Sequence, residues 1–393
     1  MSTAAARRAY RGPAFFSLGL RPFYLLGSAW AAIAVALWLS SYLGGPAGLT
    51  LDWHVHEMIF GVLAAIIAGF LTTAIPNWTM RMPVIGAPLA GLVGLWCAGR
   101  IAMLLPRAWE PLPAIIDCAF LVVVAAVIWR EILAGRNWRN APVCALVSAL
   151  AAGNILSHLS GGPLLASPGA RIALGAVAVL IALIGGRITP SFTTNWLRAR
   201  RAARLPAPFG LFDRITLTLT AVAAGAWALA PDHPASGALL AGAGLFNLAR
   251  VARWAGWLTL GEPLVWILHI GYAWLGVGLI LLGATRLTPL VAPSAGVHAL
   301  TVGAVGVMTL AVMTRSARGH TGRSLAADRA ILAIYAAINA AALTRVAAPF
   351  SGVAQPALLL VSAAFWILAF GGFAAAHAVM LTTPRPITLR GAA

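Results

Sequence analysis

The stretch LDWHVHEMIFGVLAAIIAGFLTTAIPNWTMR, which runs from Leu51 to Arg81, decides the fold because a polar opening precedes a long apolar run. Residues 56–76 can cross a bilayer, since about 20 residues of helix cover a hydrocarbon core about 30 Å thick. Lipid offers no partner to backbone N–H and C=O groups, so such a run must be a helix. The stretch therefore predicts a transmembrane helix that begins beside two histidines, an aspartate and a glutamate.

The composition of the whole chain agrees with this prediction. Of 393 residues, 61% are hydrophobic and 9% are charged, and the mean hydropathy is +0.90, which excludes a water-soluble globular domain. We predict an all-α integral membrane protein in which residues 1–393 form one polytopic transmembrane domain. Twelve apolar runs predict its transmembrane helices, at residues 22–43, 56–76, 86–105, 112–133, 141–160, 170–188, 211–230, 236–256, 263–285, 294–314, 327–348 and 356–380.

The distribution of arginine predicts the orientation. All 27 basic side chains are arginines, and alternate loops hold 22 of them against 5 in the other set. Because basic residues gather in cytoplasmic loops, we predict that both ends of the chain face the cytoplasm. Because the arginines set the orientation of the chain in the membrane, they explain the net charge of +18. We therefore expect the lipid bilayer as a partner and no nucleic acid.

Three sequence matches indicate an internal repeat. They pair YLLGSAW with ILHIGYAW, HEMIFG with HALTVG and GRIAML with TRVAAP, at offsets of 242 to 245 residues. The matches occur in the same order and predict a parallel repeat of the first four and last four helices, which would divide the chain near 1–135, 136–256 and 257–393. Chance similarity between helices rich in small residues is the alternative interpretation.

Ionisable groups inside a bilayer are costly unless they are paired, so each is a candidate ligand. His54 and His56 are two residues apart, which points them about 200° from each other on a continuous helix. A helix that begins between them, with Asp52 as its cap, would let both bind one metal ion. Otherwise His56 faces the bundle and His54 faces water. Met58 would add a soft ligand suited to copper(I), or would simply pack.

The repeat brings His298 into the same outer layer as His56. If the two face each other across the bundle, they can hold a haem iron axially or contribute to a copper site. A histidine wetted by lipid headgroups is the alternative for His298. Arg100 and Arg345 lie near the outer ends of their helices, where a guanidinium binds haem propionates bidentately or only reaches toward the interface.

Three further histidines lie within apolar runs. His269 lies about four residues inside the ninth run and is the strongest sign of buried chemistry, either as a ligand or as a hydrogen-bonded packing residue. His377 near the end of the twelfth run carries the same two interpretations. His158 follows Asn154 by one helical turn, so the pair either lines an outer cavity or lies at a wetted helix end.

The motifs resemble those of the NnrS family from about Leu20 to His320, in the segments RPFYLLGSAWAAIAVALWL, LDWHVHEMIFGVLAAIIAGFLTTAIPNWTMR, LWCAGRIAM, GRITPSF and HALTVGAVGVMTLAVMTRSARGHTGR. The resemblance implies a multi-pass protein of the bacterial inner membrane that carries haem b and copper. It also implies a role in nitric oxide metabolism during denitrification and in resistance to nitrosative stress. The motif histidines are His54, His56, His298 and His320, with Glu57 and Arg315 close by. Met80 stands where the resemblance leads us to expect a glycine after NWT.

These observations predict a membrane metalloprotein that uses haem b and copper to bind or process nitric oxide, or to protect against it. The residues do not decide whether the protein is an enzyme or which redox partner it uses. A secondary transporter of a metal, haem or a small anion is the alternative, because twelve helices with internal repetition and broken ends also suit that class. An assembly factor for a respiratory complex is a third hypothesis.

Overall fold

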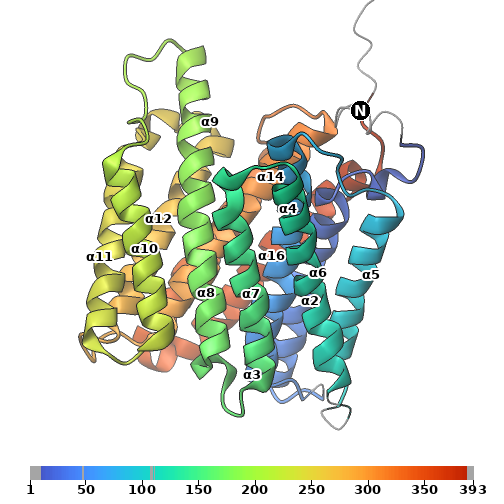
Figure 1. The fold of residues 1–393 in the computed structure, drawn as a ribbon. Coiled ribbons are helices and arrows are strands. Elements are labelled where there is room, and N and C mark those ends of the chain that lie inside the picture. The colour runs from blue at the N-terminus through green and yellow to red at the C-terminus, as the bar shows by residue number, and fades with distance from the viewer. Residues whose placement is uncertain (1–9, 47, 107–108, 110, 387–393) are drawn as a thin grey trace, which may run out of the picture.

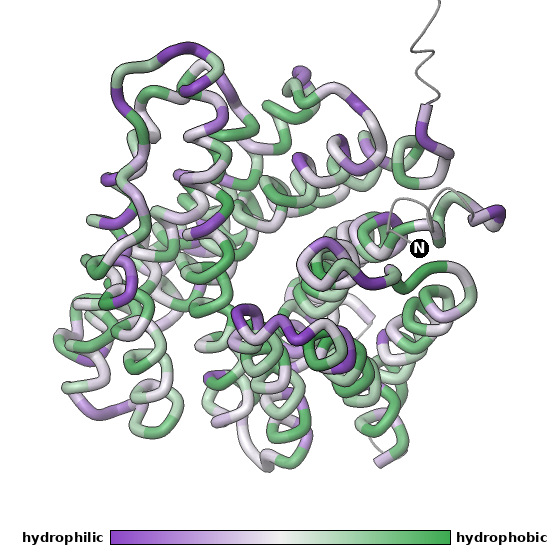
Figure 2. The backbone as a smooth tube through the Cα atoms, turned by 45° about the horizontal axis from the view of Figure 1, so that its top comes forward, coloured by the Kyte–Doolittle hydropathy of each residue, from purple (hydrophilic) through white to green (hydrophobic). Residues whose placement is uncertain are grey.

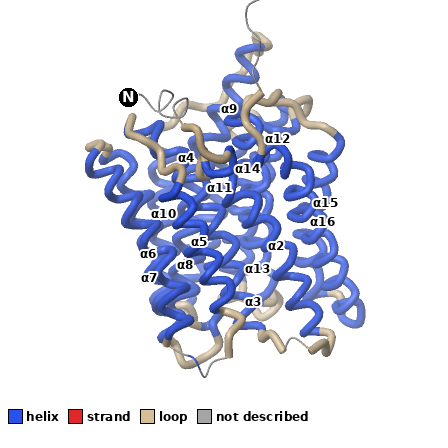
Figure 3. The backbone as a smooth tube through the Cα atoms, turned by 90° about the vertical axis from the view of Figure 1, so that its right-hand side faces the viewer, coloured by secondary structure: helices blue, strands red, loops and turns tan. Residues whose placement is uncertain are grey.

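A computed structural model describes residues 10–46, 48–106, 109 and 111–386 as a bundle of helices, with no strand in those ranges (Figures 1 and 3). Arg7, Arg8, Arg107 and Arg390, which contribute to the predicted charge asymmetry, lie outside the described residues. Each of the twelve predicted runs coincides with a helical stretch: α2 (Leu20–Tyr42), α3 to α4 (Leu51–Thr79), α5 (Ala87–Ala102), α6 (Leu112–Ala134), α7 (Ala141–Leu159), α8 to α9 (Pro168–Ala199), α10 (Leu211–Leu229), α11 (Pro234–Ala252), α12 (Pro263–Ala284), α13 to α14 (Pro293–Thr321), α15 (Arg329–Ala347) and α16 (Gln355–Thr382).

Ten of these stretches, within the described part of the chain, are long and apolar enough to cross a membrane. The helix α5 has 16 residues and falls short of the length, and α10 is not among the ten. Apolar residues run along the helices while polar residues gather toward their ends (Figure 2). The prediction of an all-helical, multi-pass membrane protein is confirmed. The number of twelve spans and the orientation stay predictions.

The helices close into a ring. Contacts join α6 to α7 and α11 to α12, and the last helix α16 packs against the first long helix α2. Three long stretches, Leu51–Thr79, Pro168–Ala199 and Pro293–Thr321, enclose an apolar cavity of about 90 Å³. The first of them is the most buried of the ten spans. Polar groups on the helix Leu51–Thr79 are therefore shielded from lipid by neighbouring helices.

Each of these three stretches contains a π-helical segment: η2 (Glu57–Leu63), η6 (Ile181–Gly185) and η8 (Ala299–Gly306). A π segment inserts an extra residue into an α-helix, which rotates the side chains on either side of it, and such segments are frequent at functional sites. The segments η2 and η8 follow His56 and His298 directly. The repeat stays a prediction, and it would explain why the π segment recurs in the second helix of each group of four.

The two ends of the helix Leu51–Thr79 bear on the predicted cap at Asp52 and on the residue at position 80. Thr50, not Asp52, caps its start, because the Thr50 hydroxyl oxygen accepts the Trp53 N–H at 3.2 Å. Asp52 instead accepts the Leu164 N–H at 2.8 Å. At the other end Met80 has a φ of 56°, in the left-handed region that favours glycine. This explains why the resemblance leads us to expect a glycine at position 80.

Candidate functional site

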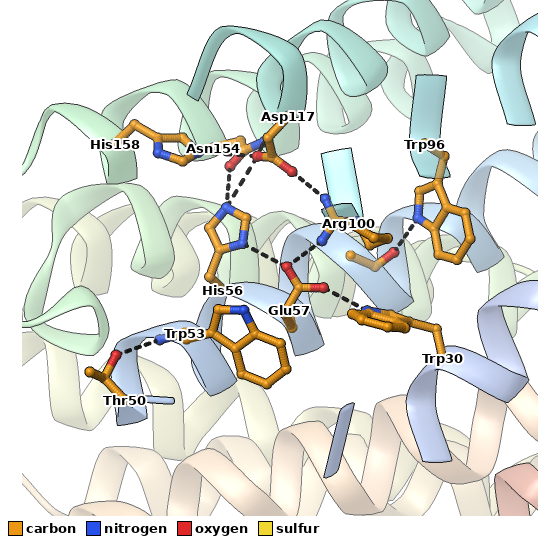
Figure 4. Close-up of polar contacts among 11 residues, drawn as sticks. Trp30, Thr50, Trp53, His56, Glu57, Trp96, Arg100, Asp117, Asn154 and His158 are labelled. Carbon is orange, nitrogen blue, oxygen red and sulfur yellow. Dashed lines mark hydrogen bonds and ion pairs between the residues drawn. The ribbon is translucent and has the colours of Figure 1, made fainter. Parts of the chain in front are cut away.

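His56 and Glu57, near the start of the helix Leu51–Thr79, form the centre of a buried polar cluster. His56 is the last residue of α3 and Glu57 is the first residue of η2, so the change from α to π geometry falls between them. His56 is 4% exposed and Glu57 is fully buried. Their side chains point toward α5, α6 and α7 (Figure 4). Two adjacent ionisable residues at this depth are tolerated only if neighbours pair with them.

Glu57 receives hydrogen bonds on both carboxylate oxygens. Arg100 Nη1 of α5 donates to Glu57 Oε1 at 2.6 Å, and Trp30 Nε1 of α2 donates to Glu57 Oε2 at 2.6 Å. Gly61, one turn along the π segment, makes this approach possible. A Cβ atom on Gly61 would lie 2.6 Å from Glu57 Oε2 and closer still to Arg100 Nη1, so a larger residue would push the two groups apart.

Asp117 of α6 connects the other half of the cluster. Its Oδ2 accepts the Asn154 Nδ2–H at 2.8 Å and lies 3.1 Å from both His56 Nε2 and His158 Nε2. Its Oδ1 accepts a hydrogen bond from Arg100 Nη2, so the same guanidinium holds both carboxylates. Residues from four stretches of helix, far apart in the sequence, therefore converge on one buried point (Figure 4).

His56, Asp117 and His158 also have the geometry of a metal site. One ligand atom from each, two imidazole nitrogens and one carboxylate oxygen, lie within 4.8 Å of one another. Two histidines and one carboxylate are donors for copper(II), iron(II) or zinc(II). The charges also favour a cation, because Glu57, Asp117 and Arg100 leave one negative charge in excess when the imidazoles are neutral. A proton on His56 or a metal ion would balance it.

His158 is the most exposed of the three candidate ligands. Its side chain is 13% exposed, whereas those of His56 and Asp117 are 5% and 0% exposed. His158 lies in the last turn of α7, next to a loop at the end of the bundle. An ion or a small molecule that approaches from this loop meets His158 before it meets the buried ligands.

Comparison with protein families decides where the chain belongs. The model of the NnrS protein family matches residues 14–385, which is nearly the whole chain. The chain belongs to the NnrS family. A search of curated proteins finds no match to it.

The histidines that the NnrS resemblance singles out do not share one site. The helix begins at Leu51, before both His54 and His56, so they point to different sides of α3. His54 stacks on Trp38 of α2, with ring centres 4.3 Å apart, instead of joining His56. This arrangement overturns the expectation that one metal ion binds both. Met58 packs against the hydrophobic core.

His298 and Arg345 lie with His54 and not with His56. His298 lies within electrostatic range of both His54 and Arg345, so the three residues are near one another. His298 Nδ1 donates to the Ser294 carbonyl oxygen at 2.6 Å, which leaves Nε2 as the nitrogen for a ligand. Arg100, the predicted counterpart of Arg345, forms ion pairs with Glu57 and Asp117.

The inner histidines are buried at separate places. His269 Nε2 pairs with the Thr193 hydroxyl at 2.8 Å, and its Nδ1 has no hydrogen-bond partner among the described residues. His377 Nδ1 donates to the Phe373 carbonyl oxygen at 3.1 Å, and its Nε2 likewise lacks a partner within the described ranges. Arg315 lies over the ring of Phe192, 4.0 Å from its centre.

Sequence reasoning missed Asp117, and with it the central contact of the cluster. The signal was present, because Asp117 is a lone aspartate within the apolar run AIIDCAFLVVV and such residues mark functional sites. Trp30 was noted only as part of the repeat, and nothing in its local sequence shows that its indole N–H meets Glu57.

Proposed function

We propose that this NnrS-family protein is a metalloprotein of the bacterial inner membrane that acts in nitric oxide metabolism, with copper held by His56, Asp117 and His158. The observation that carries the proposal is the convergence of their three ligand atoms within 4.8 Å in a largely buried cluster. Copper(II) binds nitrogen and oxygen donors more tightly than the other divalent ions of its row, so this donor set suits the metal that the family resemblance implies.

The surrounding residues support this role. His56 Nδ1 lies 3.4 Å from Glu57 Oε1, so a carboxylate holds the ring nitrogen opposite the one that faces Asp117. This is the arrangement in which an outer carboxylate orients a metal-binding imidazole. Arg100 in turn fixes Glu57 and Asp117, and Asn154 holds Asp117 Oδ2. A metal ion would replace the proton that His56 shares with Asp117, because ligands bind metals in their deprotonated form.

A metal with three protein ligands keeps an open position for a small molecule. Nitric oxide is a small apolar gas that concentrates in lipid, and the cluster lies among membrane helices with His158 at its entrance. Asn154 and the two carboxylates supply the polar contacts of the site. These features support nitric oxide as its ligand.

Haem b fits the His56 cluster poorly. His56 Nε2, the ring nitrogen that faces the other two ligands, has Asp117 and Asn154 oxygens at 3.1 and 3.2 Å, so these side chains fill the space that a haem ring would need. Neither the apolar cavity described above nor a second cavity beside α9 (Gly186–Ala199) has a histidine in its lining. Haem binding therefore stays a prediction of the family resemblance, and we assign it to no cavity. A haem iron in the half of the bundle that we predict to face the cytoplasm would bind the buried, unpaired nitrogens of His269 and His377.

Metal analysis of the purified protein tests the copper proposal. We expect the full-length chain, loaded with copper and dialysed, to retain about one ion per chain, and His158→Ala to lose it. His158 is the least buried of the three ligands, so its replacement should disturb the fold least, and the Tm of the variant checks this. His233→Ala, at an exposed position before α11, is the matched control and should retain copper. The site is refuted if His158→Ala and His233→Ala hold copper equally well.

The visible and electron paramagnetic resonance spectra test the proposed ligand. Nitric oxide should change the copper signal of the wild-type protein and leave that of His158→Ala without a response. The transporter hypothesis predicts instead a colourless protein free of metal. The apolar cavity between Leu51–Thr79, Pro168–Ala199 and Pro293–Thr321 gives that hypothesis little support, because its lining is almost entirely apolar and offers no site for an ion.

A further inference from the structure

A second cavity lies at the opposite end of the bundle from α3, where α9 (Gly186–Ala199) rises above the other helices (Figure 1). Its volume of about 360 Å³ falls in the range of small-molecule sites. One face of α9 forms a wall, through Gly186, Pro190, Ser191, Thr194, Asn195 and Arg198. The segment 205–209, Asp213 and Trp254 complete the lining.

A buried arginine lies behind this wall. Arg250 of α11 is fully buried, and its Nε donates to Asp213 Oδ1 at 2.8 Å. Its Nη1 donates to the Ala182 carbonyl oxygen and to the Tyr272 hydroxyl, both at 2.8 Å. Its Nη2 has no hydrogen-bond partner in the part of the chain that the structure describes. A buried charged donor without a partner is rare in native proteins and points to a missing acceptor.

Gly186 connects Arg250 to the cavity. A Cβ atom on Gly186 would lie 2.7 Å from Arg250 Nη2 and 2.5 Å from Nη1, so the guanidinium packs directly against a residue that lines the cavity. Trp254, another lining residue, has its ring centre 5.4 Å from the Arg250 guanidinium carbon. The unpartnered donor therefore lies behind the cavity wall, next to two lining residues, and is not itself part of the lining.

The charges around the cavity favour an anion. Asp213 is the acidic residue in the lining, but both its oxygens are engaged. Its Oδ1 accepts from Arg250, and its Oδ2 accepts from the Gly210 N–H at 3.0 Å and from Arg253 Nη1 at 3.4 Å. Arg198 adds a second guanidinium at the exposed rim. Positive charge is thus in excess.

We propose that this cavity binds the phosphate group of a small organic phosphate. Arg198 at the rim supplies a charged donor and the exposed Ser191 and Asn195 supply neutral ones, while the buried Arg250 behind the wall adds positive charge. Guanidinium groups match the several acceptor oxygens of a phosphate, and the volume leaves room for the organic part of the ligand. The phosphate comes from either a soluble ester or a lipid headgroup. This site is separate from the metal cluster.

Thermal unfolding of the full-length protein in a maltoside detergent tests the proposal, with inorganic phosphate as the probe and sodium chloride at equal ionic strength as the reference. We expect phosphate to raise the Tm of the wild-type protein above the chloride reference. Arg198→Gln should need roughly tenfold more phosphate for the same rise, because it removes one charge-assisted contact. The matched control is Arg214→Gln, which removes an equally exposed arginine beside Asp213 that does not line the cavity.

Gly186→Ala adds a test at the wall of the cavity. Its Cβ would displace the end of the Arg250 side chain, so phosphate should protect this variant less than the wild type. A parallel series compares phosphatidic acid with diacylglycerol, which lacks the phosphate. Stabilisation by phosphatidic acid alone, lost in Arg198→Gln, would identify a lipid as the source and uphold the proposal. If neither phosphate source stabilises the protein, or if Arg198→Gln and Arg214→Gln respond alike, the proposal is wrong.

Discussion

Replacing Arg100 with methionine tests the polar cluster most directly. Arg100 is 4% exposed, its Nη1 lies 2.6 Å from Glu57 Oε1, and its Nη2 bonds to Asp117. Methionine keeps much of the apolar stem but leaves two buried carboxylates without their cation. Removing one partner of a buried ion pair costs about 3–5 kcal/mol, because the other charge stays buried and unpaired. We expect Arg100→Met to lower the free energy of unfolding by that amount.

A second substitution in the same cluster separates charge from packing. Glu57→Gln removes one carboxylate, so in the double variant Arg100→Met with Glu57→Gln only Asp117 remains charged. Asp117 still has the Asn154 amide and two histidines as partners. We therefore expect the double variant to be more stable than the sum of the single changes predicts, with a coupling of about 1–3 kcal/mol.

Unfolding of the four proteins in the same detergent, by heat or by denaturant, measures this coupling. Every variant must be compared in one buffer, because detergent and salt change the apparent stability of a membrane protein. The reasoning is refuted if Arg100→Met loses less than about 1 kcal/mol, since a removed buried partner should cost more. Additivity of the two changes within about 0.5 kcal/mol would equally show that the groups do not interact.

Three further predictions concern Gly61, Met80 and the pH dependence of copper binding. Gly61→Ala should destabilise the protein by about 1–3 kcal/mol and weaken copper binding, because its Cβ would lie 2.6 Å from Glu57 Oε2; equal stability to the wild type in the same unfolding assay contradicts this. Met80→Gly should stabilise the protein by about 1 kcal/mol, since it relieves a left-handed φ of 56° at an exposed helix end, whereas an unchanged Tm counts against the strain. Copper affinity, followed by titration, should rise from pH 6 to pH 8 because the histidines must lose protons to bind metal, and a pH-independent affinity argues for other ligands.

Much of the fold could be predicted from the sequence because the bilayer acts on each helix separately. The run 56–76 corresponds to Leu51–Thr79, and the run 112–133 corresponds to Leu112–Ala134. The π segments could not be predicted in this way. The segment η2 has the apolar composition of an ordinary helix apart from Glu57, and its Gly61 carbonyl oxygen accepts the Trp96 indole N–H of another helix at 2.9 Å, a contact that the local sequence does not reveal.

Only part of the candidate site could be predicted from the sequence. His56 and Arg100 were singled out because ionisable groups in apolar runs need partners, and both lie in the buried cluster. The expected partner of His56 was His298, but the structure sets Asp117 and His158 beside it. Depth in the membrane can be inferred from the position along a run. The neighbours of a helix and its rotation about its own axis cannot, so two histidines at equal depth need not meet.

The sequence by itself determined that this chain is a helical membrane protein and approximately where its helices begin and end. It could do so because hydrocarbon thickness and the need to pair every backbone group act locally on each apolar run. Only the tertiary structure decided which imidazole meets which carboxylate, and that Arg250 lies behind a cavity wall made by Gly186. Those contacts join helices distant in the chain, and they depend on how the whole ring packs.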